Sequence, residues 1–172
     1  ISVMLVICGC IAAYKSLELT PLIKGRVIGV LSSRTRGAGE FVTPLSVASL
    51  SGAKVHTELF DLTDEIEMGH IELSRSADLL VVVPATADLM AKMAHGRADD
   101  LASTALLATD KPVLVAPAMN VRMWQHPATQ RNLRTLTADS LLDLGPNDGE
   151  MACAEFGPGR VTEPSEILTV IE

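Results

Sequence analysis

The stretch Lys111-Pro-Val-Leu-Val-Ala-Pro-Ala-Met-Asn-Val-Arg-Met-Trp124 contains the pattern that decides the fold. Its apolar range 113–116 lies between two prolines, which predicts a short strand covered on both faces. Pro117 ends this strand, and helical spacing resumes at Val121. Asn120 therefore lies at the carboxyl end of a parallel strand, where open α/β sheets bind ligands. The same position is equally typical of a helix cap, so both interpretations stay open.

The composition predicts one globular domain with an aliphatic core. The 172 residues are 48% hydrophobic but only 3% aromatic, which suits helices packed on a parallel sheet. The formal net charge of −7 argues against nucleic acid or an anionic membrane as partners, because both bind basic surfaces. No apolar run reaches the roughly 18 residues of a membrane-spanning helix. Three cysteines without metal-ligand spacing indicate reduced thiols, no metal site and a cytosolic location.

Strands and helices alternate along the sequence. Apolar, β-branched runs predict strands at 3–8, 27–31, 78–84, 113–116 and 140–144. Helical spacing predicts helices at 9–19, 41–50, 68–77, 89–94, 99–108, 121–136 and 164–171. Thr43 before Pro44 is the cap pattern of a helix start, Gly52 closes that helix, and Pro127 restarts the helix over 121–136. The range 56–66 is acidic and is expected to be irregular. We therefore expect an α/β fold with a doubly wound parallel sheet, a Rossmann/flavodoxin-like single domain over residues 1–172. The turns that follow four of the strands then open on one edge of the sheet.

Three of these turns carry groups that suit a ligand. Gly9 joins a strand to a helix, a junction typical of phosphate sites, although tight turns also need glycine for steric reasons. The polar loop 32–39 is either a second phosphate contact or an ordinary solvated loop. The turn 84–88 has small side chains, and Thr86 and Asp88 supply a helix cap and a hydrogen-bond acceptor.

Two further side chains have both a functional and a structural interpretation. His70, at or near the first turn of its helix, is either a base or an ordinary surface histidine. Cys153 lies in the range 145–160, whose glycines and prolines predict a long loop without regular structure. It is either an acid, nucleophile or redox group, or a small apolar residue that packs the loop.

Six motifs together resemble one known family, the homo-oligomeric flavin-containing cysteine decarboxylases. They cover nearly the whole chain, in order and at the family's spacing. The motifs are Gly9-Cys-Ile-Ala-Ala-Tyr-Lys15, Phe41-Val-Thr-Pro44, Gly69-His-Ile-Glu72, Pro84-Ala-Thr-Ala-Asp88, Pro117-Ala-Met-Asn-Val-Arg-Met-Trp124 and Ala152-Cys-Ala-Glu-Phe-Gly-Pro-Gly-Arg160. Within the family the resemblance is to the branch of phosphopantothenoylcysteine decarboxylases.

The resemblance implies a site for FMN between subunits of a homo-oligomer, a trimer or a multiple of trimers. By position in the motifs, three residues match the catalytic set: His70, Asn120 and Cys153. Thirteen match the cofactor-binding set: Gly9, Cys10, Ile11, Thr35, Phe41, Pro84, Ala85, Thr86, Ala87, Asp88, Ser103, Thr104 and Ala118. Four match the substrate-binding set: Met119, Asn120, Met151 and Ala152.

The implied reaction is the oxidative decarboxylation of 4′-phosphopantothenoylcysteine to 4′-phosphopantetheine in coenzyme A biosynthesis. The cysteinyl Cβ gives a hydride to oxidised flavin, which leaves a thioaldehyde that serves as the electron sink for loss of CO₂. The resulting enethiol takes the hydride back, and Cys153 on the closing segment supplies the proton. In this scheme Asn120 binds the substrate carboxylate and His70 assists as a base or electrostatic partner.

Two rival functions share the expected fold. One is a peptidyl-cysteine decarboxylase of lantibiotic maturation, and Met119, Arg122 and Trp124 argue against it. The other is a catalytically silent regulatory flavoprotein. The three unrelated polar groups at the catalytic positions argue against this second function. The resemblance also allows a fused ligase domain beyond residue 172.

Overall fold

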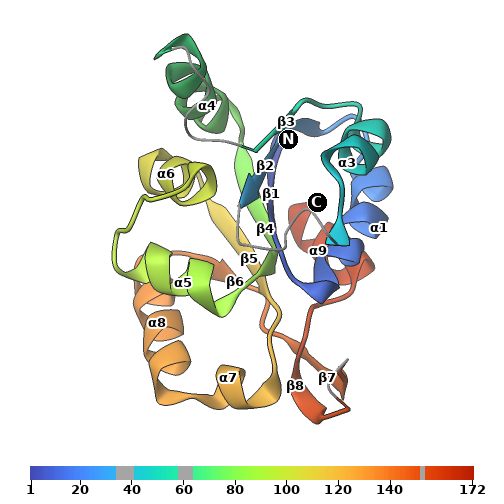
Figure 1. Cartoon of the computed structure of the whole chain (residues 1–172), viewed down its shortest axis with the longest axis vertical. Helices are drawn as coiled ribbons and strands as arrows, with labels where there is room; N and C mark the ends of the chain where they lie inside the picture. Colours follow the sequence, from blue (N-terminus) through green and yellow to red (C-terminus); the bar gives the residue numbers. More distant parts are fainter. Residues whose placement is uncertain (34–40, 58–63, 152–153) are drawn as a thin grey trace.

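A parallel β-sheet forms the centre of the molecule in the computed structural model, which describes residues 1–33, 41–57, 64–151 and 154–172 (Figure 1). Within these ranges the sheet has six strands in the order β3-β2-β1-β4-β5-β6, and every neighbouring pair is parallel. The strands are β1 (Val3–Cys8), β2 (Val27–Ser33), β3 (Val55–His56), β4 (Leu79–Ala85), β5 (Val113–Pro117) and β6 (Leu142–Asp143). This order reverses direction between β1 and β4, the point at which such sheets bind ligands.

Helices cover both faces of the sheet, which confirms the doubly wound α/β fold (Figure 1). One layer comprises α1 (Tyr14–Leu22), α3 (Pro44–Ser51) and α9 (Pro164–Ile171). The other comprises α4 (Asp64–Ser76), α5 (Ala87–Ala94), α6 (Leu101–Ala108) and α8 (Pro127–Ala138). Two short helices, η1 (Ile11–Ala13) and α7 (Val121–Gln125), follow the carboxyl ends of β1 and β5. None of the described helices is long and apolar enough to cross a membrane.

Strand β1 shows why the sheet is apolar throughout. All six of its residues are buried, and they alternate between the two faces as the strand period requires. Val3, Leu5 and Ile7 belong to the core cluster under α1 and α9, while Met4 and Val6 belong to the cluster under α5 and α6. A strand with two buried faces needs a continuous apolar run, which is the pattern that predicted it.

Several helix boundaries agree with the sequence-based expectations. Thr43 caps α3 by accepting a hydrogen bond from the backbone N–H of Ser46, Pro44 is the first helical residue, and Gly52 ends the helix with φ +67°. Pro127 likewise separates α7 from α8, because it occupies the first position of the second helix.

Other boundaries differ from the expectations. Helix α4 has 13 residues, so His70 lies near its middle and not in the first turn. The range 56–66 is not wholly irregular, since β3 ends and α4 begins within it. Strand β2 is longer than expected and β6 is shorter. Ser32 and Ser33 extend β2 because they pair with Ile7 and Cys8 of β1. Strand β6 is a marginal strand at the edge of the sheet, so in both cases pairing decides the bounds more than local sequence does.

The prediction that residues 145–160 lack regular structure is wrong. Strands β7 (Asn147–Glu150) and β8 (Phe156–Arg160) form an antiparallel hairpin that is separate from the main sheet. Both strands of a two-stranded ribbon are edge strands, so Pro158 is tolerated although it cannot donate a backbone hydrogen bond. Gly157 adopts φ +147°, a conformation that side chains disfavour. The glycines and prolines of this range form part of a hairpin and not of the long loop that their composition predicts.

Candidate active site

Because all strands of the main sheet are parallel, the segments after β1, β4 and β5 meet at its carboxyl edge. A cavity of about 420 Å³ opens there, between the segments after β1 and β5 and the β7–β8 hairpin. Six residues expected to bind cofactor or substrate contribute to its wall: Cys10, Ile11, Ala118, Met119, Asn120 and Met151. The fold thus brings together residues from three distant parts of the chain.

Asn120 serves both as a helix cap and as a polar group of the cavity. Its Oδ1 accepts hydrogen bonds from the backbone N–H groups of Arg122 and Met123, at 2.9 and 3.2 Å. Its Nδ2 donates to Oε2 of Glu155 over 2.6 Å. The cap fixes which end of the amide faces the helix, so the donor end faces the hairpin. The two interpretations of Asn120 from sequence are therefore compatible.

Sequence reasoning did not identify Glu155, which contacts the cavity residue Asn120 but does not itself line the cavity. Its Oε1 lies 3.7 Å from Nε of Arg122, an exposed side chain, so water screens this ion pair strongly. The Glu155 backbone belongs to a turn in which Met151 N–H donates to the Glu155 carbonyl and Ala154 N–H donates to the Met151 carbonyl, both at 2.9 Å. A single acid among small and apolar residues after Cys153 was the available signal.

Gly159 allows the hairpin to approach the end of β5 closely. Met119 N–H donates to the Gly159 carbonyl over 3.0 Å. A Cβ built on Gly159 would lie 2.2 Å from the Met119 carbonyl oxygen and 2.8 Å from Sδ of Met151. With a side chain at this position, the hairpin and the segment after β5 could not both keep their positions. This glycine therefore sets the distance between these two walls of the cavity.

Ionic contacts anchor the base of the hairpin to two helices. Glu163, the N-cap residue of α9, accepts a hydrogen bond from Lys15 Nζ at 2.7 Å and one from Arg160 Nη2 at 2.8 Å. Lys15 is almost fully buried. Its hydrogen bond lowers the pKa of the Glu163 carboxyl. On the other strand of the hairpin, Asn147 Nδ2 donates to Glu166 over 2.7 Å.

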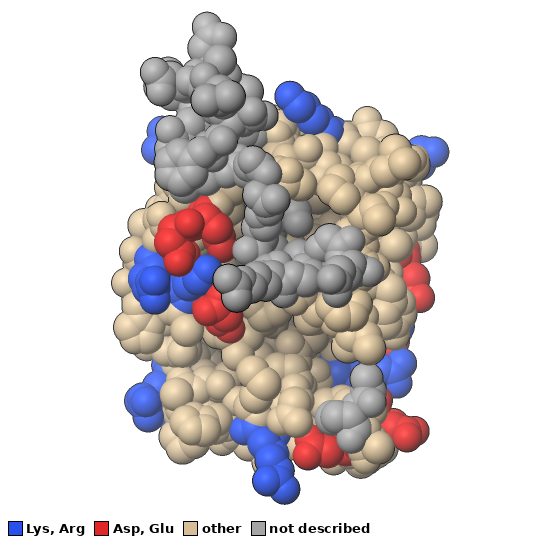
Figure 2. Space-filling view, viewed as in Figure 1, with Lys and Arg blue, Asp and Glu red and all other residues tan. Residues whose placement is uncertain are grey.

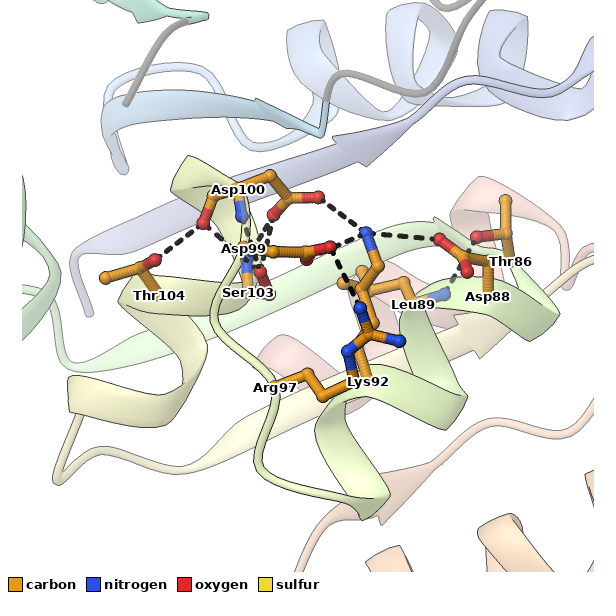
Figure 3. Close-up of polar contacts among 9 residues, drawn as sticks. All are labelled: Thr86, Asp88, Leu89, Lys92, Arg97, Asp99, Asp100, Ser103 and Thr104. Carbon is orange, nitrogen blue, oxygen red and sulfur yellow. Dashed lines mark hydrogen bonds and ion pairs between the residues drawn. The ribbon is translucent and has the colours of Figure 1, made fainter. Parts of the chain in front are cut away.

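A second polar cluster lies between α5 and α6, beside the end of β4 (Figure 3). Nζ of Lys92 faces three carboxylates, at 3.3 Å from Asp88 and 3.1 Å from both Asp99 and Asp100. Acidic and basic side chains lie side by side over these helices in Figure 2. Thr86 caps α5 by accepting a hydrogen bond from Leu89 N–H, as the turn 84–88 predicted.

The charges in this cluster stabilise one another. Burial by itself lowers the pKa of Lys92, but hydrogen bonds to Asp99 and Asp100 outweigh it, so the pKa is raised overall. Burial alone raises the pKa of Asp100, but hydrogen bonds from Ser103 and Lys92 outweigh it and lower the pKa. The Lys92 ammonium and the Asp100 carboxylate are therefore charged at neutral pH.

Ser103 and Thr104, expected to bind cofactor, belong to this cluster and do not line the 420 Å³ cavity. The Ser103 hydroxyl accepts from Asp100 N–H in a capping box and donates to Asp100 Oδ1 over 2.7 Å. The Thr104 hydroxyl donates to the Asp100 carbonyl over 2.7 Å. Ser103 also contributes to the wall of a separate hollow of about 550 Å³ bounded by α5, α6 and α8. In this conformation both hydroxyls bond within the first turn of α6.

The two described cysteines are neutral thiols. Burial raises the pKa of Cys8 to about 12, although hydrogen bonds with Thr86 oppose the shift. Burial also raises the pKa of Cys10 against the opposing effect of the backbone N–H groups of Ala12 and Ala13. Cys10 therefore gives the cavity wall a small, weakly polar atom and not a reactive thiolate.

The remaining expected site residues fall into three groups. Gly9, Pro84, Ala85 and Ala87 lie at the carboxyl ends of β1 and β4, and the Phe41 side chain is 49% exposed. His70 lies on α4, of which only the backbone is described at that position. Thr35, Ala152 and Cys153 lie outside the described residues.

The whole chain, residues 1–172, matches the Flavoprotein family. It is 48% identical over 170 residues to the coenzyme A biosynthesis bifunctional protein CoaBC of Vibrio cholerae and 46% identical to that of Escherichia coli K12. These alignments cover 99% of this chain but 43% and 41% of the relatives, so the chain spans about two fifths of their length.

Two solved structures are similar over nearly the whole chain. A cysteine-to-serine mutant of PPC decarboxylase complexed with pantothenoylaminoethenethiol matches with a TM-score of 0.84 and 31% identity, covering 99% of this chain and 95% of that one. The FMN binding protein AtHal3 matches with a TM-score of 0.80 and 32% identity, covering 99% and 94%. With this fold, this cavity and these similarities, the chain belongs to the Flavoprotein family.

Proposed function

We propose that this chain is an FMN-dependent decarboxylase that converts 4′-phosphopantothenoylcysteine to 4′-phosphopantetheine in coenzyme A biosynthesis. The observation that carries the proposal is the cavity in which the Asn120 amide, Met119 and Met151 lie beside the segment after β1. Identity of up to 48% to CoaBC proteins and the similarity to PPC decarboxylase support it.

The residues at the carboxyl edge fit FMN. When bound, FMN supplies a hydride acceptor that is also a hydride donor. The side chains at the ends of β1, β4 and β5 are small, namely Gly9, Ala85 and Ala118, which leaves room for a flat ring beside the backbone. Thr86 and the start of α5 offer hydroxyl and amide groups of the kind that bind phosphate. Thr35 is proposed as a further phosphate contact.

Within this cavity, the Asn120 amide orients the substrate by donating to its carboxylate. The helix cap supports this role because it holds the donor end of the amide toward the hairpin. A carboxylate that accepts one hydrogen bond from a fixed, neutral amide stays weakly held, which suits a group that must leave as CO₂. His70 is proposed as the electrostatic partner and Cys153 as the proton donor.

We also propose that the site is completed by a second copy of the chain in a homo-oligomer. Several apolar side chains near the cavity are largely exposed in a single copy, among them Ile11 at 59% and Phe156 at 77%. Exposed apolar groups of this size around a cavity typically mark an interface. Light scattering on the FMN-loaded protein tests this proposal, and a monomer that retains flavin and activity would contradict it.

The proposed function is tested by flavin absorption of the purified protein, followed by CO₂ release from 4′-phosphopantothenoylcysteine. A peptide with a carboxyl-terminal cysteine is the matched comparison, since it has the same reacting group without the phosphopantothenoyl part. We expect turnover of the first compound and little of the second. A flavin-free protein, or a preference for the peptide, would overturn the proposal.

The role of Cys153 gives a sharper test of the same reaction. Cys153→Ser removes the proposed proton donor, so in air, where O₂ reoxidises the reduced flavin, CO₂ release should continue while the oxidised enethiol accumulates in place of 4′-phosphopantetheine. Mass spectrometry of the products distinguishes the two compounds. Full formation of 4′-phosphopantetheine by this variant would exclude Cys153 as the donor.

A further inference from the structure

The hydrogen bond between Asn120 and Glu155 places a carboxylate of the protein on the amide that the proposed function assigns to the substrate carboxylate. The distance from Nδ2 to Oε2 is 2.6 Å, which is short even for a hydrogen bond to a charged acceptor. Resting on that proposed function, we infer that Glu155 is an internal competitor for the substrate carboxylate. It determines how strongly the cavity prefers the acid substrate over the decarboxylated product.

The competition follows from charge and geometry. A substrate carboxylate that accepts a hydrogen bond from Asn120 would lie against Glu155, and two carboxylates at hydrogen-bonding separation repel each other. Glu155 must therefore leave Asn120 when the substrate binds. Arg122, whose side chain is 87% exposed, can accompany the Glu155 carboxylate toward solvent.

The Glu155 side chain can move without the backbone around it. The turn is held by the Met151 N–H to Glu155 carbonyl bond and the Ala154 N–H to Met151 carbonyl bond, neither of which involves the carboxylate. The Glu155 side chain is 32% exposed, so solvent is available on one side. Displacement therefore breaks the bond to Asn120 and leaves the cavity wall formed by Met151 in place.

Substrate and product then differ in what they displace. The acid substrate binds only after Glu155 has released Asn120, and this lowers its apparent affinity. The product has no carboxylate, so Glu155 keeps or regains its bond to Asn120 while the product is bound. The difference between the affinities of the protein for the anionic substrate and for the less charged product is therefore smaller. Once CO₂ has left, the Asn120 amide again donates a hydrogen bond to Glu155.

The test compares two unreactive ligands on the FMN-loaded protein, N-(4′-phosphopantothenoyl)serine and N-(4′-phosphopantothenoyl)ethanolamine. They differ only in the carboxylate, and calorimetry gives their dissociation constants while CO₂ release is followed to verify that neither is consumed. Glu155→Gln should bind the serine ligand about tenfold more tightly, because a neutral amide competes less well for Asn120. Its affinity for the ethanolamine ligand should stay within about twofold.

Glu150→Gln is the matched control, because Glu150 lines the cavity at the end of β7, on the other side of the hairpin turn from Glu155. It removes the same charge but leaves the Glu155–Asn120 hydrogen bond in place, so the serine ligand, with its additional negative charge, should gain less than about threefold over the ethanolamine ligand. Glu155→Asp withdraws the carboxylate by one methylene. It should change the ratio of the affinities for the serine and ethanolamine ligands in the same direction as Glu155→Gln, and it keeps the test available if Glu155→Gln folds poorly.

An unchanged ratio of the two affinities in the Glu155 variants overturns the inference alone. A wild-type holoprotein that binds neither ligand overturns the proposed function together with the inference.

Discussion

Two regions of the molecule place a carboxylate on a nitrogen donor, and they differ in what surrounds the contact. At Lys92 three carboxylates converge on one ammonium between two helices, and Asp100 is also held by the α6 capping box. At Asn120 a single carboxylate accepts from a neutral amide beside a cavity. The first arrangement is satisfied by the protein alone and stabilises the fold. In our inference, the second exchanges its carboxylate for that of the ligand.

The largest effect is expected from Asn120→Asp. Aspartate keeps an oxygen for the backbone N–H groups of Arg122 and Met123, so the cap of α7 is retained. The donor toward the cavity becomes a second oxygen that repels both Glu155 and the substrate carboxylate. CO₂ release should fall about a thousandfold, while the free energy of unfolding changes by less than about 1 kcal/mol. Activity within tenfold of wild type would show that the amide donor is dispensable.

The next effect concerns the backbone contact that fixes the cavity wall. Gly159→Ala puts a methyl group against the Met119 carbonyl and should cost about 3 kcal/mol of unfolding free energy, because the nearest atom is backbone and cannot rotate away. Gly149→Ala is the control, since its methyl would meet the flexible Arg160 side chain at 3.0 Å and should cost less than about 1 kcal/mol. Equal losses of unfolding free energy in the two variants, measured by urea denaturation, would contradict the close approach at Gly159.

Lys92→Met tests whether the second region is structural. The substitution leaves three carboxylates without their ammonium, and we expect the free energy of unfolding to fall by about 2 kcal/mol. This is less than for a fully buried ion pair, because Asp88 and Asp99 are partly exposed. Lys111→Met serves as the control, because the Lys111–Asp110 pair at 3.5 Å is more exposed and should contribute less than about 0.5 kcal/mol. Chemical denaturation of both variants measures the difference, and similar losses would refute a structural role for the cluster.

The smallest effect is a dependence on pH. The pKa of Asp100 is lowered in the folded state, so its carboxylate adds stability above the unfolded value of about 4. That contribution is lost as the pH falls through the lowered folded value. Asp100→Asn should therefore cost about 1 kcal/mol at neutral pH and progressively less in acid below about pH 4. Parallel unfolding curves for wild type and variant as a function of pH test this, and a constant difference would contradict it.

The parts of the fold that depend on buried apolar runs could be predicted from sequence. The continuous runs of β1, β4 and β5 and the Thr43-Pro44 and Pro127 signals gave strands and helix starts within one or two residues. These elements are determined by local pattern and by burial on both faces. The hairpin could not be predicted in this way, because its glycines and prolines have the same composition as a loop and only pairing between its strands distinguishes the two.

The candidate site was predictable in its positions but not in its contacts. Asn120 and Met151 were placed at the cavity through motif and topology, whereas Glu155 was missed because its importance comes from a contact across 35 residues. Ser103 and Thr104 show the opposite case, since their hydroxyls suggested ligand contacts but bond to Asp100 at the start of α6 in the structure. A short polar side chain before or within the first turn of a helix satisfies the backbone whether or not a ligand is near.

Among the described residues the hairpin shares no strand ladder with the main sheet, and its amides pair between β7 and β8. Under the proposed function, changes of sequence in the hairpin can therefore alter which carboxyl-bearing molecule is accepted without disturbing the order of the six parallel strands. A substrate range could in this way diversify by exchange of one short module on a constant scaffold. The contacts that such an exchange must keep include the close approach at Gly159 and the hydrogen bonds to Glu163 and Glu166.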